Sequence, residues 1–101
     1  MLETFTLATF TPLVGTNFEV TIAEGKTVML RLTSATSLSR GGGVPRGHAR
    51  EPFSLVFHGP AKPALPQRTY QFKHPDRGVF ELFVVPIGPD EDGPRYEAIF
   101  T

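Results

Sequence analysis

The chain has 101 residues, which is enough for one domain with a hydrophobic core of its own. Its ten basic residues balance its ten acidic ones, and this neutral charge argues against a dedicated nucleic-acid-binding protein, which normally carries a basic surplus. The absence of cysteine excludes a disulfide framework, a thiolate metal site and a cysteine nucleophile.

The sequence shows no segment that would place the chain in a membrane. No apolar stretch approaches the roughly 20 residues that a transmembrane helix needs. Residues 1–30 contain no basic start followed by an uninterrupted apolar run, which is the pattern of a secretory signal. We therefore expect a cytoplasmic protein with no membrane partner.

The N-terminal segment predicts one short helical turn. Leu7, Phe10 and Leu13 recur at helical spacing, and Thr6 is a suitable residue to cap the turn. Residues 5–7 also alternate like a strand, so a strand is the alternative here.

Two strands are expected next, at Asn17–Ala23 and Thr27–Ala35. The apolar side chains that alternate along them are Phe18, Val20 and Ile22 on the first strand, and Val28, Leu30 and Leu32 on the second. A three-residue turn at residues 24–26 sets these two rows opposite each other, whereas a two-residue turn would split them. We therefore predict the register in which Val20 faces Leu30.

Four further strands alternate in the same way. They are expected at Pro52–Gly59, Thr69–His74, Val79–Pro86 and Arg95–Phe100. Their inward side chains are expected to be Phe53, Leu55 and Phe57, then Tyr70 and Phe72, then Phe80, Leu82 and Val84, and finally Tyr96, Ala98 and Phe100. Residues 75–78 form the turn between the fourth and fifth strands, because proline fixes φ at the start and glycine accepts a left-handed conformation at the end.

The predicted fold is an all-β domain of about six antiparallel strands. The two candidate architectures are a small closed barrel and a tight two-sheet sandwich, and we favour the barrel because it removes exposed sheet edges. Consecutive strands are expected to pair as hairpins, except across the link between the second and third. The domain covers residues 1–101, with a flexible Gly-rich loop at about residues 36–50.

Six segments of the chain together resemble one known family. They are Thr9–Gly15, Phe53–Pro60, Leu65–Gln67, His74–Gly78, Leu82–Gly88 and Tyr96–Phe100. The chain is similar through them to a family of small bacterial proteins filed as a domain of unknown function. The resemblance implies a β-domain without an established activity, and it suggests an association with phage-tail-like proteins.

The three histidines do not predict a metal site. If the third and fourth strands form a hairpin, His58 and His74 lie at its opposite ends, roughly 16 Å apart. His48 lies in a loop, and two histidines without a carboxylate are a poor set of ligands. We expect no metal and no other cofactor.

The acidic run Asp90–Gly93 has the look of a calcium loop but fails its pattern. An EF-hand needs an acidic residue at the fifth position and glycine at the sixth, where this chain has Pro94 and Arg95. The run therefore predicts a solvated hairpin loop.

The Gly-rich loop is the candidate site for an anion or an acidic partner. Gly41–Gly43 could offer backbone N–H groups, with Arg40, Arg46 and Arg50 nearby. No Lys-Ser or Lys-Thr pair and no helix follow, so the segment is not a P-loop. A flexible loop is the first interpretation, and weak anion binding is the alternative.

No set of side chains predicts catalysis. Ser54 and His58 share one face of a strand, but four residues separate them, which is about 13 Å and too far for proton transfer. We therefore expect the protein not to be an enzyme.

Apolar side chains remain on the side of the strands opposite to the core. They are Val79, Phe83 and Val85 on the fifth strand, Ile99 on the sixth and Val56 on the third. Three explanations are open: the N-terminal turn covers them, a second copy of the chain binds them, or they form a groove for another protein.

These patterns predict a non-enzymatic protein-interaction or structural-accessory domain. Its partner is another protein or a second copy, bound at Phe83, Val85 and Ile99 or at the loop with Arg40, Arg46 and Arg50. The alternative is a barrel that binds a small ligand or a carbohydrate through polar groups on the loops of one rim.

Overall fold

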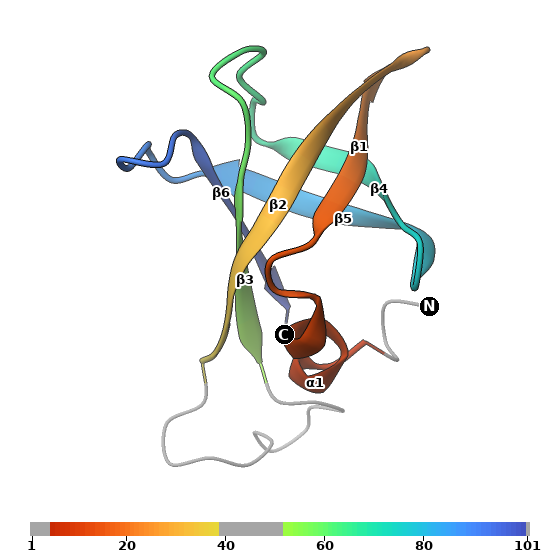
Figure 1. The fold of residues 1–101 in the computed structure, drawn as a ribbon, viewed down its shortest axis with the longest axis vertical. Helices are drawn as coiled ribbons and strands as arrows, with labels where there is room; N and C mark the ends of the chain where they lie inside the picture. The colour runs from red at the N-terminus through yellow and green to blue at the C-terminus, as the bar shows by residue number, and fades with distance from the viewer. Residues whose placement is uncertain (1–4, 39–51, 101) are drawn as a thin grey trace.

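The computed structural model describes residues 5–38 and 52–100, and within them six antiparallel strands form a closed barrel (Figure 1). The strands are β1 (Asn17–Ala23), β2 (Lys26–Ser37), β3 (Phe53–His58), β4 (Arg68–His74), β5 (Gly78–Pro86) and β6 (Arg95–Phe100). A helical turn, α1 (Leu7–Phe10), runs into a 3₁₀ turn, η2 (Thr11–Leu13). The barrel prediction is thus confirmed over the sandwich. No helix in the described part of the chain has the length and apolar character needed to cross a bilayer.

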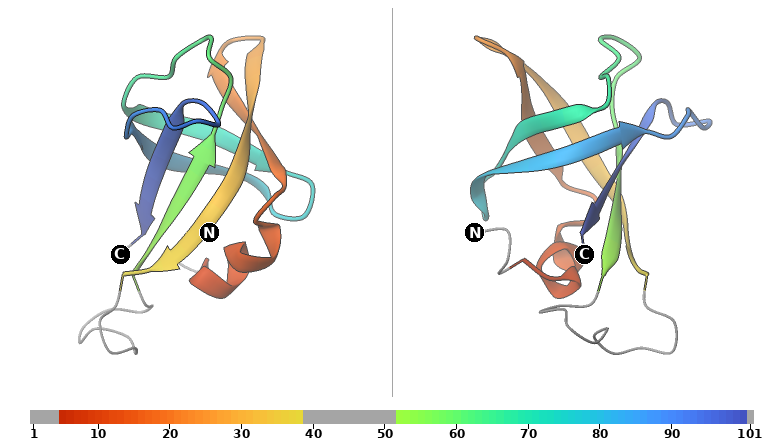
Figure 2. Two further views of the ribbon diagram at one scale, coloured as in Figure 1. Left: turned by 60° about the vertical axis from the view of Figure 1, so that its left-hand side comes forward. Right: turned by 180° about the vertical axis from the view of Figure 1, so that it is seen from behind.

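The barrel is built from a curved sheet and a hairpin that crosses it. Strands β1, β2, β3 and β6 pair in that order along most of their lengths, and β4 pairs with β5 throughout. The β4–β5 hairpin runs across the other strands (Figures 1 and 2). It joins the sheet through two short runs of paired residues, which we call seams. Between β1 and β4, Glu19 pairs with Lys73, Val20 with Phe72 and Thr21 with Gln71. Between β5 and β6, Val85 pairs with Glu97 and Pro86 with Tyr96.

The predicted register between β1 and β2 is wrong. The turn has two residues between paired Ala23 and Lys26, and Val20 faces Val28 rather than Leu30. A bulge at Ile22 shifts β1 by one residue and so restores the match between apolar faces that a two-residue turn would otherwise destroy. The requirement that apolar faces meet was right, but the chain satisfies it with an extra residue inside the strand.

The predicted hairpin between β3 and β4 is also wrong, because β3 pairs with β6. Residues 59–67 instead carry the chain across one end of the barrel. Leu65 is buried there, and its N–H donates a hydrogen bond to the Tyr96 hydroxyl at 3.0 Å. Gly59 permits the close approach that begins this crossing, since a Cβ would lie 2.6 Å from Leu30 Cδ2. Alternation shows which face of a strand is buried, but not which strand lies beside it.

Strand β2 is longer than predicted and includes the first residues assigned to the Gly-rich loop. Thr36 and Ser37 pair with Ser54 and Phe53 of β3. Residues 39–51, which include Arg40, Arg46 and Arg50, lie outside the described residues.

The N-terminal turn closes the other end of the barrel. Thr6 precedes α1, and its N–H donates to Thr9 Oγ1 at 3.0 Å, which confirms the helical prediction over the strand. The Phe10 ring is fully buried, with its centroid 6.3 Å from that of Phe80 on β5 and 5.4 Å from that of Phe100 on β6. Phe5 packs edge-on against Phe80 at 5.2 Å. These rings lie where β5 and β6 have no ladder pairs, at the end of the barrel that Figure 2 shows beside α1.

We expect Phe10→Ala to destabilise the protein by about 3–5 kcal/mol, because it removes a fully buried ring that bridges two strands. Urea unfolding followed by circular dichroism measures this. Leu7→Ala, on the same turn but only partly buried, is the control and should cost clearly less. A loss below about 1 kcal/mol for Phe10→Ala would show that the turn does not hold the barrel closed.

Candidate functional site

The outer side of β5 carries the first candidate site. Inward Phe80, Leu82 and Val84 are buried, whereas outward Val79 is 48% exposed and Phe83 is 52% exposed. The outward positions of neighbouring β4, which are Thr69, Gln71 and Lys73, are polar, as expected for the solvent side of a one-sided sheet. The apolar side chains on β5 therefore depart from the pattern of the strand beside them.

Phe83 is the one phenylalanine whose side chain is exposed. The chain has nine, and the other eight have at most 6% of their surface exposed. Ile99, on β6, is 57% exposed, and Val85 is partly buried. We call Phe83, Val85 and Ile99 the β5–β6 outer face. The structure leaves this predicted set on the surface of two adjoining strands.

The N-terminal turn does not cover the β5–β6 outer face, which corrects the first of the three explanations. Phe10 and Leu13 point into the barrel and are buried there, while Phe83 and Ile99 stay half exposed. The turn instead covers the inside of one end of the barrel, where β5 and β6 are not paired and their inward rings would otherwise be exposed. Association with a second copy and binding of another protein remain.

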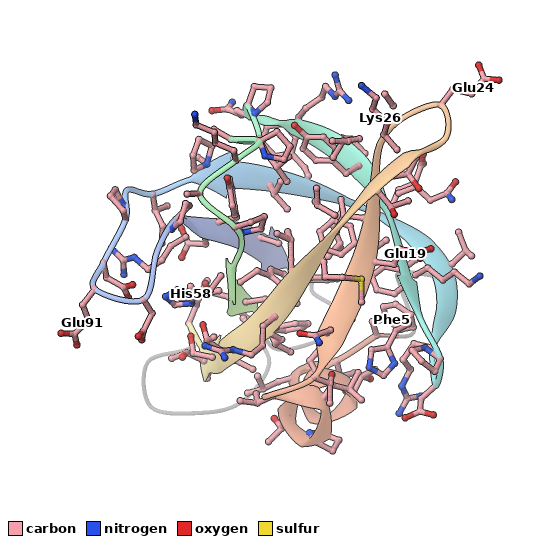
Figure 3. All side chains as sticks on the ribbon, turned by 45° about the horizontal axis from the view of Figure 1, so that its top comes forward. Phe5, Glu19, Glu24, Lys26, His58 and Glu91 are labelled. Atoms are coloured by element: carbon pink, nitrogen blue, oxygen red, sulfur yellow. The ribbon has the colours of Figure 1, made fainter. Side chains whose placement is uncertain are left out.

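The second candidate site begins at His58, the last residue of β3. Its Nδ1 lies 2.8 Å from Thr33 Oγ1 on β2, and its Nε2 lies 2.9 Å from Asp90 Oδ2 on the β5–β6 loop. Thr33 Oγ1 also lies 3.1 Å from the Val56 carbonyl, to which it can donate. Figure 3 shows the imidazole beside this loop, with Glu91 at the tip pointing away. The His58 side chain is only 11% exposed.

Hydrogen bonds within the β5–β6 loop position the Asp90 carboxylate. Asp90 and Gly93 exchange two backbone hydrogen bonds of 3.0 Å, and the Asp92 N–H donates to Asp90 Oδ1 at 2.9 Å. The Gly59 N–H donates to the Pro94 carbonyl at 3.1 Å, which ties the loop to the end of β3. The hydrogen bond from His58, more than any other interaction, lowers the pKa of Asp90 below its usual value.

A surface pocket of about 440 Å³ opens beside His58. Its polar lining comes from Asn17 on β1, Arg31 on β2, His58 and Asp92. Gly59 and Pro60 form part of its wall. The pocket therefore offers an amide, a guanidinium, an imidazole and a carboxylate on the outside of the barrel.

The acidic loop is an exposed turn, as predicted, but its contact with His58 was not expected from the sequence. His58 faces the loop because β3 pairs with β6. The predicted β3–β4 hairpin placed His58 beside β4 instead, so its contact with Asp90 could not be expected. His74 lies elsewhere, with its Nε2 3.0 Å from Thr16 Oγ1. The Ser54 hydroxyl donates its hydrogen to Glu97 Oε2 at 2.7 Å. The spacing of His58 and Asp90 along the chain carries no signal of their contact.

Comparison with known proteins gives one result. The model of the family described as Domain of unknown function (DUF6916) matches residues 5–100. No curated protein and no solved structure matches the chain.

We expect Thr33→Val to destabilise the protein by about 1–2 kcal/mol, although valine fills the same volume. The change leaves His58 Nδ1 and the Val56 carbonyl without the hydroxyl they contact, at a partly buried position. Thermal unfolding measures the loss. Thr36→Val on the same strand is the control, and an equal loss there would mean that the hydroxyl at residue 33 has no special part.

Proposed function

Since the chain belongs to the family of domains of unknown function DUF6916, we propose a function from the surface of the chain itself. It is a non-enzymatic protein-interaction module that binds a second copy of itself through the β5–β6 outer face. The observation that carries this proposal is the exposure of Phe83 while eight other phenylalanines are buried. A ring left in water forgoes roughly 1.5–3 kcal/mol that burial would supply.

The symmetry of a two-copy complex favours this partner. In a twofold interface each residue of the face is used twice, so Phe83 and Ile99 contribute four apolar side chains from a single small surface. The zero net charge of the chain adds no long-range repulsion between copies. Val79, 48% exposed, lies on the same side of β5 but is separated from Phe83 by exposed Glu81.

A small-ligand-binding module is the second candidate, and the pocket beside His58 favours it. Leu65 closes one end of the barrel and Phe5 and Phe10 close the other, so the buried rings leave the outside of the barrel as the place for a ligand. Titration with a set of monosaccharides, followed by NMR, tests this candidate. Shifts confined to residues around Arg31 and His58 would support it, and their absence would count against carbohydrate binding there.

Three finer predictions from the sequence stay predictions. They are the association with phage-tail-like proteins, the bacterial source with its cytoplasmic location, and the binding of an anion or a partner at the Gly-rich loop. The loop arginines, Arg40, Arg46 and Arg50, lie outside the described residues.

We expect Phe83→Asp to convert a dimeric parent into a folded monomer, because a charge replaces the ring at the centre of the interface. Its effect on monomer stability should stay within about 0.5 kcal/mol, since the ring is half exposed. Light scattering after size-exclusion chromatography over a range of concentrations gives the mass.

Met29→Asp is the matched control, because Met29 is 50% exposed but lies on β2. This variant should remain dimeric. A monomeric parent would refute self-association, and a dimer in Phe83→Asp would place the interface elsewhere.

A further inference from the structure

We propose that His58, Asp90 and Asp92 form a binding site for a divalent cation of the zinc type. One ligand atom from each of these residues lies within 4.8 Å of the other two. Zinc binds imidazole nitrogen and carboxylate oxygen at about 2.0–2.2 Å, so two ligands of one ion are at most roughly 4 Å apart. His58 Nε2 and Asp90 Oδ2, at 2.9 Å, already meet this limit, and Asp92 needs only a small side-chain movement.

The hydrogen bonds on the far side of the imidazole provide independent support. Thr33 Oγ1 has one hydrogen, which it can donate to the Val56 carbonyl at 3.1 Å. With a cation on Nε2, the imidazole carries its hydrogen on Nδ1, which lies 2.8 Å from Oγ1 and donates to it. This arrangement leaves Nε2 directed at Asp90, as in zinc sites whose histidine donates its other N–H to a neutral or acidic acceptor.

The other ring nitrogen is already directed at a carboxylate. His58 Nε2 lies 3.0 Å from Asp90 Oδ1 and 2.9 Å from Asp90 Oδ2, so an N–H on Nε2 donates to Asp90 when no metal is bound. A divalent ion bound between them takes the place of that hydrogen, with the imidazole nitrogen and the carboxylate as its ligands.

The surroundings of the site suit a zinc ion with an open coordination position. Asp90 and Asp92 are exposed on the loop, so the ion can enter from solvent. His58 and Asp92 also line the pocket of about 440 Å³, which leaves room for water or a small ligand on the ion. The cations nearby are Arg95, whose Nε is 3.9 Å from Asp90 Oδ2, and Arg31 in the pocket lining. Two carboxylates offset these two charges.

The ligand types select among cations. Calcium takes six to eight oxygen ligands, and magnesium keeps most of its water, whereas imidazole nitrogen favours zinc and related transition metals. A site with one nitrogen and two carboxylates therefore discriminates against calcium and magnesium.

Isothermal titration of the full chain with zinc chloride tests the proposal. The parent should bind one zinc ion at this site, measured as a stoichiometry of one. His58→Gln and Asp90→Asn should abolish measurable binding. Thr33→Val, which removes the contact behind the imidazole, should weaken binding about 10–100-fold.

Three controls make the result specific. Glu91→Gln removes one negative charge from the same loop, but Glu91 points away from His58 (Figure 3), so zinc affinity should not change. Asp92→Asn alters an exposed side chain and should keep the fold while weakening binding. His48→Gln should bind zinc like the parent.

Clear outcomes would overturn the proposal. They are the absence of zinc binding by the parent, unchanged affinity in His58→Gln or Asp92→Asn, or an equal loss in Glu91→Gln. Calcium or magnesium binding as tight as that of zinc would show that the imidazole is not a ligand.

Discussion

The packing of buried aromatic rings is the interaction on which the barrel depends. The hairpin β4–β5 meets the rest of the sheet through short seams, so backbone hydrogen bonds alone hold it weakly at both sides. Phe18 on β1 bridges one side, with ring centroids 6.3 Å from those of Phe72 and Phe80. Phe10 bridges the other. Each such pair contributes about 0.5–1.5 kcal/mol beyond the area it buries, a large amount in a domain of this size.

The strands could be predicted from the sequence because burial imposes alternation locally. Strand β6 was predicted with its observed bounds, and its inward Tyr96, Ala98 and Phe100 are all buried. The bulge at Ile22 could not be predicted, because an extra residue in a strand leaves the alternation on each side intact. The pairing of β3 with β6 depends on how the connection crosses the barrel, and nothing in either strand specifies that path.

The two candidate sites differ in how far the sequence reveals them. Phe83 breaks the alternation of one strand, so a local pattern is enough to single it out. His58 and Asp90 are separated by 32 positions, and each looks ordinary in its own segment. Their contact follows from the pairing of β3 with β6, which brings the end of one strand to the loop before the other. A site of this kind becomes visible only when the topology is known.

The contact between Phe10 and Phe100 also governs when the chain can fold during its synthesis. The two rings pack at 5.4 Å, yet a ribosome makes them ninety positions apart. Strand β3 can pair with β2 as soon as both have been made, but its other edge stays unpaired until β6 is made. The nascent chain therefore exposes the apolar sides of β1, β2 and β3 to solvent or to chaperones until Phe100 has been made and can pack against them. Folding that awaits contacts so distant along the chain is slow, and it occurs as a single late event rather than strand by strand.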